Sequence, residues 1–205
     1  MSRSKSSQRW LNEHHNDDFV RKSRLESYRS RSVYKLAEIE QRDRIIRPEM
    51  SVIELGAAPG GWTQYVAEKL SAKGSLLAVD ILKMDPVPGA QIIQGDFTEL
   101  ETLESIRSTL DGRAADLVLS DMAPNFSGQV AVDQPRAMYL AELALDMCKE
   151  LMVPGGCLLV KTFHGAGFEE YVRQVRDMFG EVRSRKPKAS RARSREVYIL
   201  AKDRK

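Results

Sequence analysis

The chain has 205 residues, of which 42% are hydrophobic and 30% charged, and its formal net charge is +3. This length favours one domain, and this hydrophobic content excludes a chain that is disordered throughout. No apolar run approaches the roughly 20 residues that span a bilayer, and residues 1–7 lack the apolar core of a signal peptide. We therefore expect a cytoplasmic protein that makes no contact with a membrane.

Basic residues gather at the two ends of the chain. Residues 1–31 contain eight Lys or Arg against four Asp or Glu, and residues 183–195 contain seven Lys or Arg and no acid. Such segments suit a polyanionic partner, because each cation that meets a phosphate releases counterions; a solvated surface is the alternative. We interpret residues 1–28 as a basic, partly disordered N-terminal arm and residues 29–205 as a single domain.

Apolar periodicity predicts the secondary structure in chain order. Two helices come first, over residues 8–22 and 30–44. Strands and helices then alternate, with strands expected over 51–55, 75–80, 90–94, 116–120, 156–161, 181–185 and 196–201, and helices over 61–70, 99–110, 133–151 and 168–179. This alternation is typical of a parallel sheet with helices on both faces. Cys148 and Cys157 lie in apolar stretches outside any CxxC pair, which predicts buried free thiols.

A glycine-rich loop follows the first expected strand and precedes a helix. Gly56, Gly60 and Gly61 have no side chain, so the backbone there can approach a ligand closely. Their spacing differs from the GxGxxG pattern that holds the pyrophosphate of a dinucleotide. The loop therefore favours a nucleoside ligand without phosphate, such as S-adenosylmethionine (SAM), over NAD.

Two acidic residues end the next two strands. Asp80 lies 20 residues after Gly60 and is placed to accept hydrogen bonds from ribose hydroxyls, and Asp96 is placed to bind an adenine amino group. Both lie at the sheet edge where open α/β sheets bind ligands. The alternative is that both only cap helices. Trp62 and Phe97 are candidates for apolar contact with the ligand, and core packing is the other interpretation of Phe97.

Four charged residues form a second candidate cluster. Asp121 and Lys161 end parallel strands, so they share one edge of the sheet, and Glu196 joins them if the last strand is antiparallel. Lys35 lies on the second expected helix. An ammonium group within the apolar run around Lys161 needs a partner, since burying an unpaired charge is costly. A purely structural ion pair with Asp121 or Glu196 is the alternative.

Several motifs give the chain a resemblance to a known family. Residues 55–62, 120–125, 160–161 and 190–198 are similar to those of the FtsJ/RlmE family, and the similarity runs from about residue 9 to residue 201. Members of that family are heat-shock 2′-O-ribose methyltransferases of large-subunit ribosomal RNA. The resemblance implies a Rossmann-like SAM-dependent methyltransferase domain over residues 29–205. We expect a mostly parallel seven-stranded sheet with one antiparallel C-terminal strand.

The resemblance also implies roles for single residues. The family's Lys-Asp-Lys-Glu tetrad falls on Lys35, Asp121, Lys161 and Glu196. Its SAM contacts fall on Gly60, Trp62, Asp80, Asp96 and Asp121. The implied substrate is a uridine in the A loop of 23S rRNA, methylated within the assembled 50S subunit.

Lys161 is the residue that we expect at the reacting hydroxyl. A lysine is ordinarily protonated at neutral pH, and Asp121 and Glu196 would favour that form, which orients the hydroxyl and stabilises a developing alkoxide. Desolvation or the charge of Lys35 would instead free Lys161 to act as a base. We expect Lys35 and Glu196 to position the target nucleotide.

Other functions remain open at this point. The same chemistry on a tRNA or an mRNA cap is one, although no aromatic slot for a methylated guanine is evident, and a non-catalytic RNA-binding assembly factor is another. No His or Cys cluster has metal-ligand spacing, so we expect no metal, and nothing indicates more than a monomer. Tyr34 and Tyr198 are candidates for base stacking or for core packing, and His164 for substrate contact or for the surface.

Overall fold

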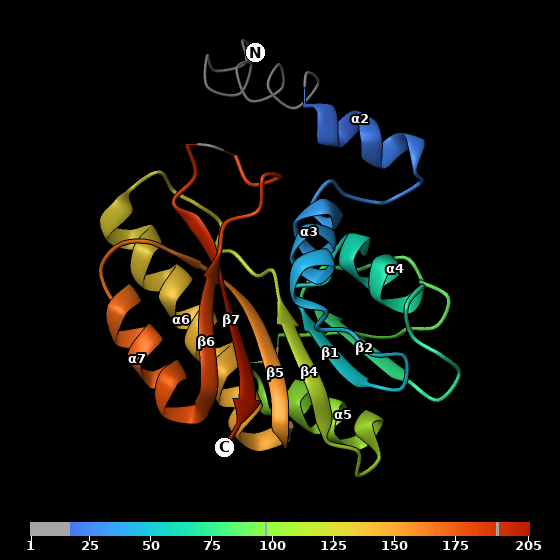
Figure 1. Cartoon of the computed structure of the whole chain (residues 1–205). Helices are drawn as coiled ribbons and strands as arrows, with labels where there is room; N and C mark the ends of the chain where they lie inside the picture. The colour runs from blue at the N-terminus through green and yellow to red at the C-terminus, as the bar shows by residue number, and fades with distance from the viewer. Residues whose placement is uncertain (1–16, 97, 192) are drawn as a thin grey trace.

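The computed structural model describes residues 17–96, 98–191 and 193–205 (Figure 1). Most of the first expected helix, over residues 8–22, lies outside this range, as does Phe97. The described helices are α2 (Asp18–Leu25), α3 (Val33–Asp43), α4 (Gly61–Ala67), α5 (Leu100–Leu110), α6 (Val130–Leu151) and α7 (Phe168–Met178). Within the described part of the chain, no helix combines the length and the apolar character that a bilayer crossing requires.

Seven strands form one sheet in the order β3-β2-β1-β4-β5-β7-β6. The strands are β1 (Ser51–Leu55), β2 (Ser75–Asp80), β3 (Gln91–Gln94), β4 (Ala115–Ser120), β5 (Met152–Phe163), β6 (Phe179–Arg185) and β7 (Glu196–Arg204). Strand β7 is antiparallel to both its neighbours, whereas all other pairings are parallel. The expected mostly parallel, Rossmann-like sheet with one antiparallel C-terminal strand is confirmed.

The order of the strands creates a crevice at the carboxyl edge of the sheet. From β1 the chain moves outward through β2 to β3 and then returns to β4 on the other side of β1. Connections therefore leave β1 and β4 in opposite directions. A reversal of this kind leaves an opening beyond the strand ends, where α/β proteins bind their ligands.

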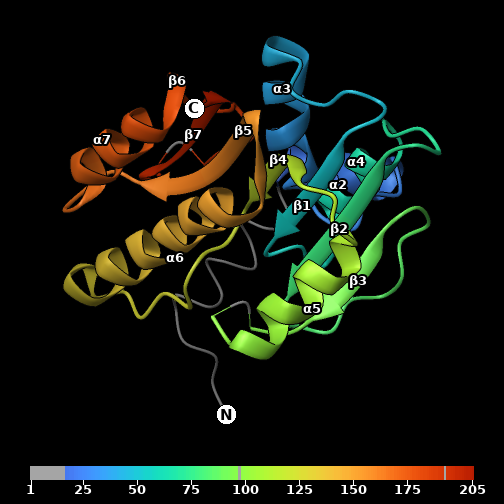
Figure 2. The same ribbon diagram turned by 90° about the horizontal axis from the view of Figure 1, so that it is seen from below.

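Helices cover both faces of the sheet, as the strand and helix alternation predicts (Figure 2). On one face, Leu36 and Ile39 of α3 join Trp62 and Val66 of α4 in a buried cluster over the central strands. On the other face, α5, α6 and α7 bury a second cluster. Cys148 belongs to the second cluster and Cys157 to the first, and both are buried free thiols, as expected.

Most element boundaries differ from the expected ones by only a few residues. The largest difference is at β5, which begins at Met152 rather than at residue 156. Helix α6 begins at Val130 rather than at residue 133. The carboxylate of Asp133 accepts hydrogen bonds from the backbone N–H groups of Ser127 and Gly128, at 2.8 and 2.9 Å. Asp133 therefore fixes the loop before the helix from within the first turn, instead of capping the helix start.

A buried ion pair attaches the end of α3 to β6, the edge strand of the sheet. The Arg185 guanidinium donates to both carboxylate oxygens of Asp43, at 2.7 and 2.5 Å, and the Asp43 side chain is only 2% exposed. Lys202 Nζ donates to the Asp43 carbonyl at 2.8 Å. These bonds join α3 to β6 and β7, and so they determine where the rest of α3, including Lys35, lies.

Replacing Asp43 by Asn is expected to lower the free energy of unfolding by about 2–4 kcal/mol at pH 7, because Arg185 loses its charged partner. Hydrogen bonding from Arg185 holds the pKa of Asp43 below its usual value of 3.8 in spite of burial. The contribution is therefore complete above the unfolded pKa and is lost as the pH falls through the lowered folded pKa.

Urea denaturation between pH 3 and pH 7 measures this difference. Asp146→Asn is a matched control, since Asp146 forms an exposed pair with Lys149 on α6 and its loss is expected to cost less than about 1 kcal/mol. Equal stability of D43N and the parent at pH 7 would contradict the proposed attachment.

Candidate active site

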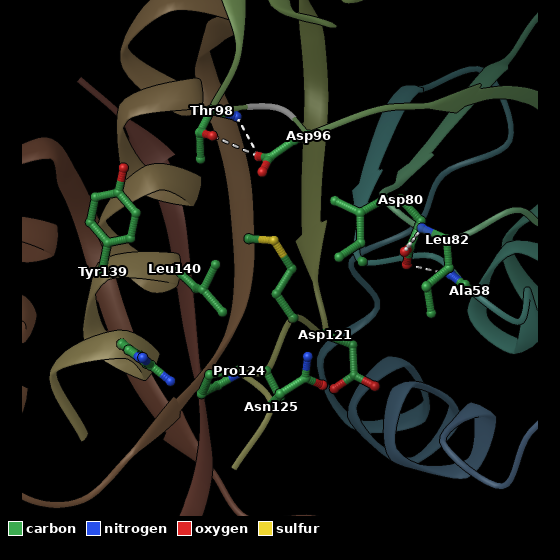
Figure 3. A pocket seen from close by; sticks show the side chains of 15 residues that line it. Ala58, Asp80, Leu82, Asp96, Thr98, Asp121, Pro124, Asn125, Tyr139 and Leu140 are labelled. Atoms are coloured by element: carbon green, nitrogen blue, oxygen red, sulfur yellow. Dashed lines mark hydrogen bonds between the residues drawn. The ribbon is translucent and has the colours of Figure 1, made fainter. Parts of the chain in front are cut away.

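A cavity of about 540 Å³ opens at the carboxyl edge of the sheet, where the connections after β1 and β4 run in opposite directions. Its lining includes the carboxylates of Asp80, Asp96 and Asp121, which come from three different strand ends, and Figure 3 shows them around the opening. Tyr139 and Leu140 of α6 form an opposite wall, also seen in Figure 3. Sequence reasoning missed this helical wall, because nothing in the periodicity of α6 indicates that its exposed face borders a cavity.

The glycine-rich loop borders the cavity through Gly56. This residue has φ +74°, and a Cβ atom there would lie 2.7 Å from Met122 Cγ. Gly60, the residue directly before α4, has φ +105°, and a Cβ atom there would lie 2.9 Å from Arg29 Nη1. A Cβ atom on Gly61 would lie 2.4 Å from Ser30 Oγ. Gly60 and Gly61 thus accommodate the segment before α3, and neither lines the cavity.

Arg29 holds the two loops at the mouth of the cavity together. Its guanidinium donates to the Asp85 carbonyl and to the Pro86 carbonyl, each at 2.6 Å, and to the Pro59 carbonyl at 3.4 Å. The segment that follows β2 is therefore tied to the glycine-rich loop by one side chain from the start of the domain.

Asp80 and Asp96 hold backbone turns and also face the cavity. Asp80 accepts from the N–H groups of Ala58 and Leu82, each at 2.8 Å, and Asp96 accepts from Thr98 N and Oγ1 at 2.9 and 2.7 Å. A carboxylate offers about four acceptor positions, so each retains capacity for a ligand. The local turn role and the ligand role are compatible.

Lys161 and Asp121 form a buried ion pair beside the cavity. Lys161 Nζ lies 3.0 Å from Asp121 Oδ1 and also donates to the Asp121 carbonyl. The Lys161 side chain is 8% exposed. Asp121 belongs to the lining of the cavity as well, so one carboxylate connects the cavity to the cationic head of Lys161.

Lys35 and Glu196 form a second pair on the same edge. Lys35 Nζ lies 2.7 and 2.8 Å from the two carboxylate oxygens of Glu196, and Ser190 Oγ donates to Glu196 Oε1 at 2.7 Å. Glu196 opens β7 opposite Phe163, the last residue of β5. The antiparallel last strand thus brings Glu196 to the edge that holds Lys161 and Asp121.

Tyr198 connects the two pairs. It lies directly opposite Lys161 in the β5–β7 register, its hydroxyl donates to Asp121 Oδ1 at 2.6 Å, and Lys35 Nζ lies 5.8 Å from the centre of its ring. The ring is buried, so Tyr198 is a core residue with a polar contact to the site. Sequence reasoning named Tyr198 without this role, which only the cross-strand register reveals.

The surrounding charges keep Asp121 ionised. Burial raises the pKa of this carboxyl, but the charges of Lys161 and Lys35, together with the hydrogen bonds from Tyr198 and Lys161, bring the pKa below its usual value. Burial raises the pKa of the Tyr198 hydroxyl far above its usual range, and the negative charge of Asp121 adds to this. At neutral pH Asp121 is therefore an anion and Tyr198 a neutral donor.

Trp62 lies outside the cavity. Its ring is 2% exposed and packs 5.8 Å from the ring of Tyr198, and its Nε1 donates to the Ser32 carbonyl at 2.8 Å. Trp62 therefore packs against Tyr198 and holds the start of α3 by its hydrogen bond to Ser32. A direct contact between Trp62 and a ligand stays a prediction.

Arg31 meets the basic segment 183–195 next to Lys35 and Glu196. Arg31 donates to the Ala189 carbonyl at 2.6 Å, and its Nε lies 3.1 Å from Asp17.

Within residues 183–195, Arg185 is buried against Asp43 and Lys186 donates to the carbonyls of Ser194 and Glu196 at 2.5 Å. The side chains of Lys188, Arg193 and Arg195 are exposed. Part of the basic segment therefore serves the fold, and part faces solvent beside the site.

Glu54 is buried beneath the site on β1. Its carboxyl accepts a hydrogen bond from Thr63 Oγ1 at 2.7 Å. Burial raises the pKa of Glu54 to about 8, and the negative charges of Asp121 and Asp80 add to the shift. Glu54 is therefore largely protonated at neutral pH and adds no third negative charge between the two aspartates.

Comparison with known proteins places this geometry in a family. Residues 28–204 match the family described as FtsJ-like methyltransferase. The chain is 55% identical over 202 residues to ribosomal RNA large subunit methyltransferase E of Legionella pneumophila, with 98% of each chain covered. It is 55% identical over 198 residues to the protein of the same name in Chromohalobacter salexigens, with 97% of this chain and 94% of the relative covered. A crystal structure of a Plasmodium falciparum protein described as a ribosomal RNA methyltransferase has a similar fold, with a TM-score of 0.76 at 24% identity, covering 86% of this chain and 98% of that one.

Replacing Glu54 by Gln is expected to remove a pH-dependent loss of stability. The folded pKa of about 8 exceeds the ordinary value of 4.5, so the stabilising contribution of the protonated acid is complete below pH 4.5 and is lost as the pH rises through 8. Between pH 5 and pH 9 the parent chain should lose up to about 4 kcal/mol of unfolding free energy relative to E54Q.

Chemical denaturation at several pH values measures this loss. Glu104→Gln, an exposed position on α5, is the control and should follow the parent profile. Parallel profiles for E54Q and the parent chain would show that Glu54 is not held protonated in the fold.

Proposed function

This chain belongs to the FtsJ-like methyltransferase family, and from that premise we propose that it transfers a methyl group from SAM to a ribose 2′-hydroxyl of large-subunit ribosomal RNA. The observation that carries the proposal is the contact between the Lys161–Asp121 pair and the cavity. It puts an ammonium group next to the place where a methyl donor would bind. The relatives named as ribosomal RNA large subunit methyltransferase E support the choice of RNA.

The cavity suits SAM in size and charge. Cavities of roughly 300–1,000 Å³ hold ligands of this size, and the volume here is about 540 Å³. Its charged lining consists of Asp80, Asp96, Asp121 and Arg136. Three carboxylates against one guanidinium favour a cationic ligand and disfavour a pyrophosphate. When bound, SAM supplies an activated methyl group on its sulfonium sulfur.

Asp80 and Asp96 are the residues that we assign to the nucleoside part of the donor, with Gly56 allowing close approach of the backbone. Gly60 leaves room for the Arg29 side chain, and Trp62 packs against the Tyr198 ring; both lie outside the lining of the cavity. Asp121 both lines the proposed donor cavity and pairs with Lys161. It would therefore set the position of the methyl donor relative to the ribose hydroxyl at Lys161.

The proposed chemistry requires a positioned hydroxyl. The ribose oxygen forms a bond to the methyl carbon while the bond from that carbon to sulfur breaks, and the hydroxyl proton passes to solvent water. Lys161 has three N–H donors, and its two hydrogen bonds to Asp121 leave one for the ribose oxygen. In the proposed role, the ammonium group of Lys161 orients the hydroxyl and stabilises the developing alkoxide.

Lys35 and Glu196 are assigned to holding the target nucleotide. Both lie at the junction of the N-terminal segment with the loop that follows β6, where exposed Lys188 and Arg195 are available for phosphates. Such contacts position RNA without reading its sequence. The target that the family resemblance implies is a uridine in the A loop of 23S rRNA within the 50S subunit. On this proposal the enzyme acts as a monomer in the cytoplasm, where subunits are assembled.

Lys161→Ala is expected to lower the rate of methyl transfer by at least about 100-fold, with SAM affinity within about threefold of the parent. The assay is incubation with methyl-labelled SAM and unmethylated large ribosomal subunits, separated rRNA or tRNA, followed by mapping of the labelled nucleotide. Asp80→Ala should show the opposite pattern, with weaker SAM binding by calorimetry. Near-parental transfer by K161A, or label on a base instead of a 2′-oxygen, would refute the proposal.

Lys161→Arg separates the two roles of the ammonium group. An arginine keeps its charge throughout the accessible pH range, so an electrostatic role should retain part of the activity, about a tenth or more. A base role should leave K161R as inactive as K161A. The comparison of kcat for K161R and K161A under the same conditions is the measurement, with melting temperatures confirming that both variants are folded.

RNA affinity is expected to fall steeply with salt, and Arg195→Ala should make the slope of log affinity against log salt shallower by about 0.7–0.9, the value for one phosphate contact. Fluorescence anisotropy between 50 and 300 mM salt measures the slope. Lys149→Ala on α6, whose side chain pairs with Asp146, is the control and should leave the slope unchanged. An affinity insensitive to salt would exclude phosphate contacts.

A further inference from the structure

An exposed aromatic side chain stands next to the proposed reaction centre. Phe126, in the loop between β4 and α6, is 55% exposed. Its ring packs edge to face against Phe163, with the ring centres 5.3 Å apart. Phe163 and Lys161 lie two residues apart on β5, so their side chains project from the same face of the sheet, about 6.6 Å apart along the strand.

The loop is built to hold Phe126 in this place. On its carboxyl side, Asp133 accepts from Ser127 N, Ser127 Oγ and Gly128 N, at 2.8 to 2.9 Å. On its amino side, Asn125 belongs to the lining of the cavity (Figure 3). Phe126 is thus held on its carboxyl side and follows a residue that lines the cavity, and more than half of its side chain is exposed.

An open aromatic face beside a ribose-binding residue suits a nucleobase. RNA enzymes and RNA-binding proteins hold unstacked bases on aromatic rings, and a base must leave its neighbours for its ribose to enter a closed site. The separation between Phe163 and Lys161 along β5 is comparable to the span from a 2′-oxygen to the base of the same nucleotide. No charged residue of the loop, residues 122–129, competes for this position.

We propose that Phe126, supported by Phe163, is the platform on which the base of the target nucleotide stacks while Lys161 contacts its 2′-oxygen. This inference rests on the proposed function, since it assumes that a ribose lies at Lys161. It assigns Phe126 to substrate binding and leaves the donor site unchanged.

The test compares four variants in methyl transfer to unmethylated large ribosomal subunits. Phe126→Ala and Phe126→Leu should lower kcat/KM by about tenfold, because both remove the aromatic face, whereas Phe126→Tyr should stay within about twofold of the parent. SAM affinity should be unchanged in all. Val130→Ala is the matched control, since Val130 is 57% exposed and lies nearby at the start of α6.

Three results would overturn the inference. Parental activity of F126A would exclude any role in substrate binding. Parental activity of F126L would show that apolar bulk suffices. An equal loss in V130A would indicate an apolar docking face for a protein of the subunit instead of a base.

A second measurement does not depend on methyl transfer. A single-stranded RNA that contains 2-aminopurine should lose fluorescence on binding the parent chain, by stacking, and should lose markedly less on binding F126A. Equal quenching by both proteins would refute the platform even if no methyl group is transferred. Failure of the proposed function would appear separately, as absence of ribose methylation by the parent chain.

Discussion

The buried contact between Asp121 and Lys161 is the constraint on which the arrangement of the site depends. Two opposite charges are stable in a desolvated position only while each has its partner and its hydrogen bonds. Lys161 meets both the side chain and the backbone carbonyl of Asp121, so the ends of β4 and β5 are held in one relative position. Tyr198 extends this constraint to β7 through its bond to Asp121. The cavity and the Lys161 side of the site therefore share one anchored carboxylate.

The charges around the site are balanced in pairs. Lys161 faces Asp121, and Lys35 faces Glu196. Beneath them Glu54 stays protonated because burial and the neighbouring aspartates raise the pKa of its carboxyl. The cavity surface carries the carboxylates of Asp80 and Asp96 in addition to the paired Asp121, and on the proposed function a sulfonium ion would benefit from their charge. The exposed cations Lys188 and Arg195 lie on the side of Glu196, where RNA phosphates would approach on the same proposal.

Much of this architecture could be predicted from the sequence, because apolar runs and strand order determine which residues share a sheet edge. The strand pattern alone places Asp121, Lys161 and Glu196 at one edge of the sheet. Contacts between segments distant in the chain could not be predicted in the same way. The role of Tyr198 depends on its register opposite Lys161, and the fit of Gly60 and Gly61 depends on Arg29 and Ser30 folding back over them. The wall formed by Tyr139 depends on the exact direction of α6 across the cavity, which residue periodicity does not specify.

The position of β7 has a consequence for how the enzyme is made. This strand is the last in the chain, yet it is inserted between β5 and β6 instead of lying at an edge. The ion-pair partner of Lys35 is Glu196, 161 residues further along the chain, and the cross-strand neighbour of Lys161 is Tyr198. During synthesis, which proceeds from the N-terminus, the strands that line the cavity are made before β7, and Lys35 and Lys161 gain Glu196 and Tyr198 as neighbours only once β7 has left the ribosome. A product truncated before β7 would therefore lack these contacts.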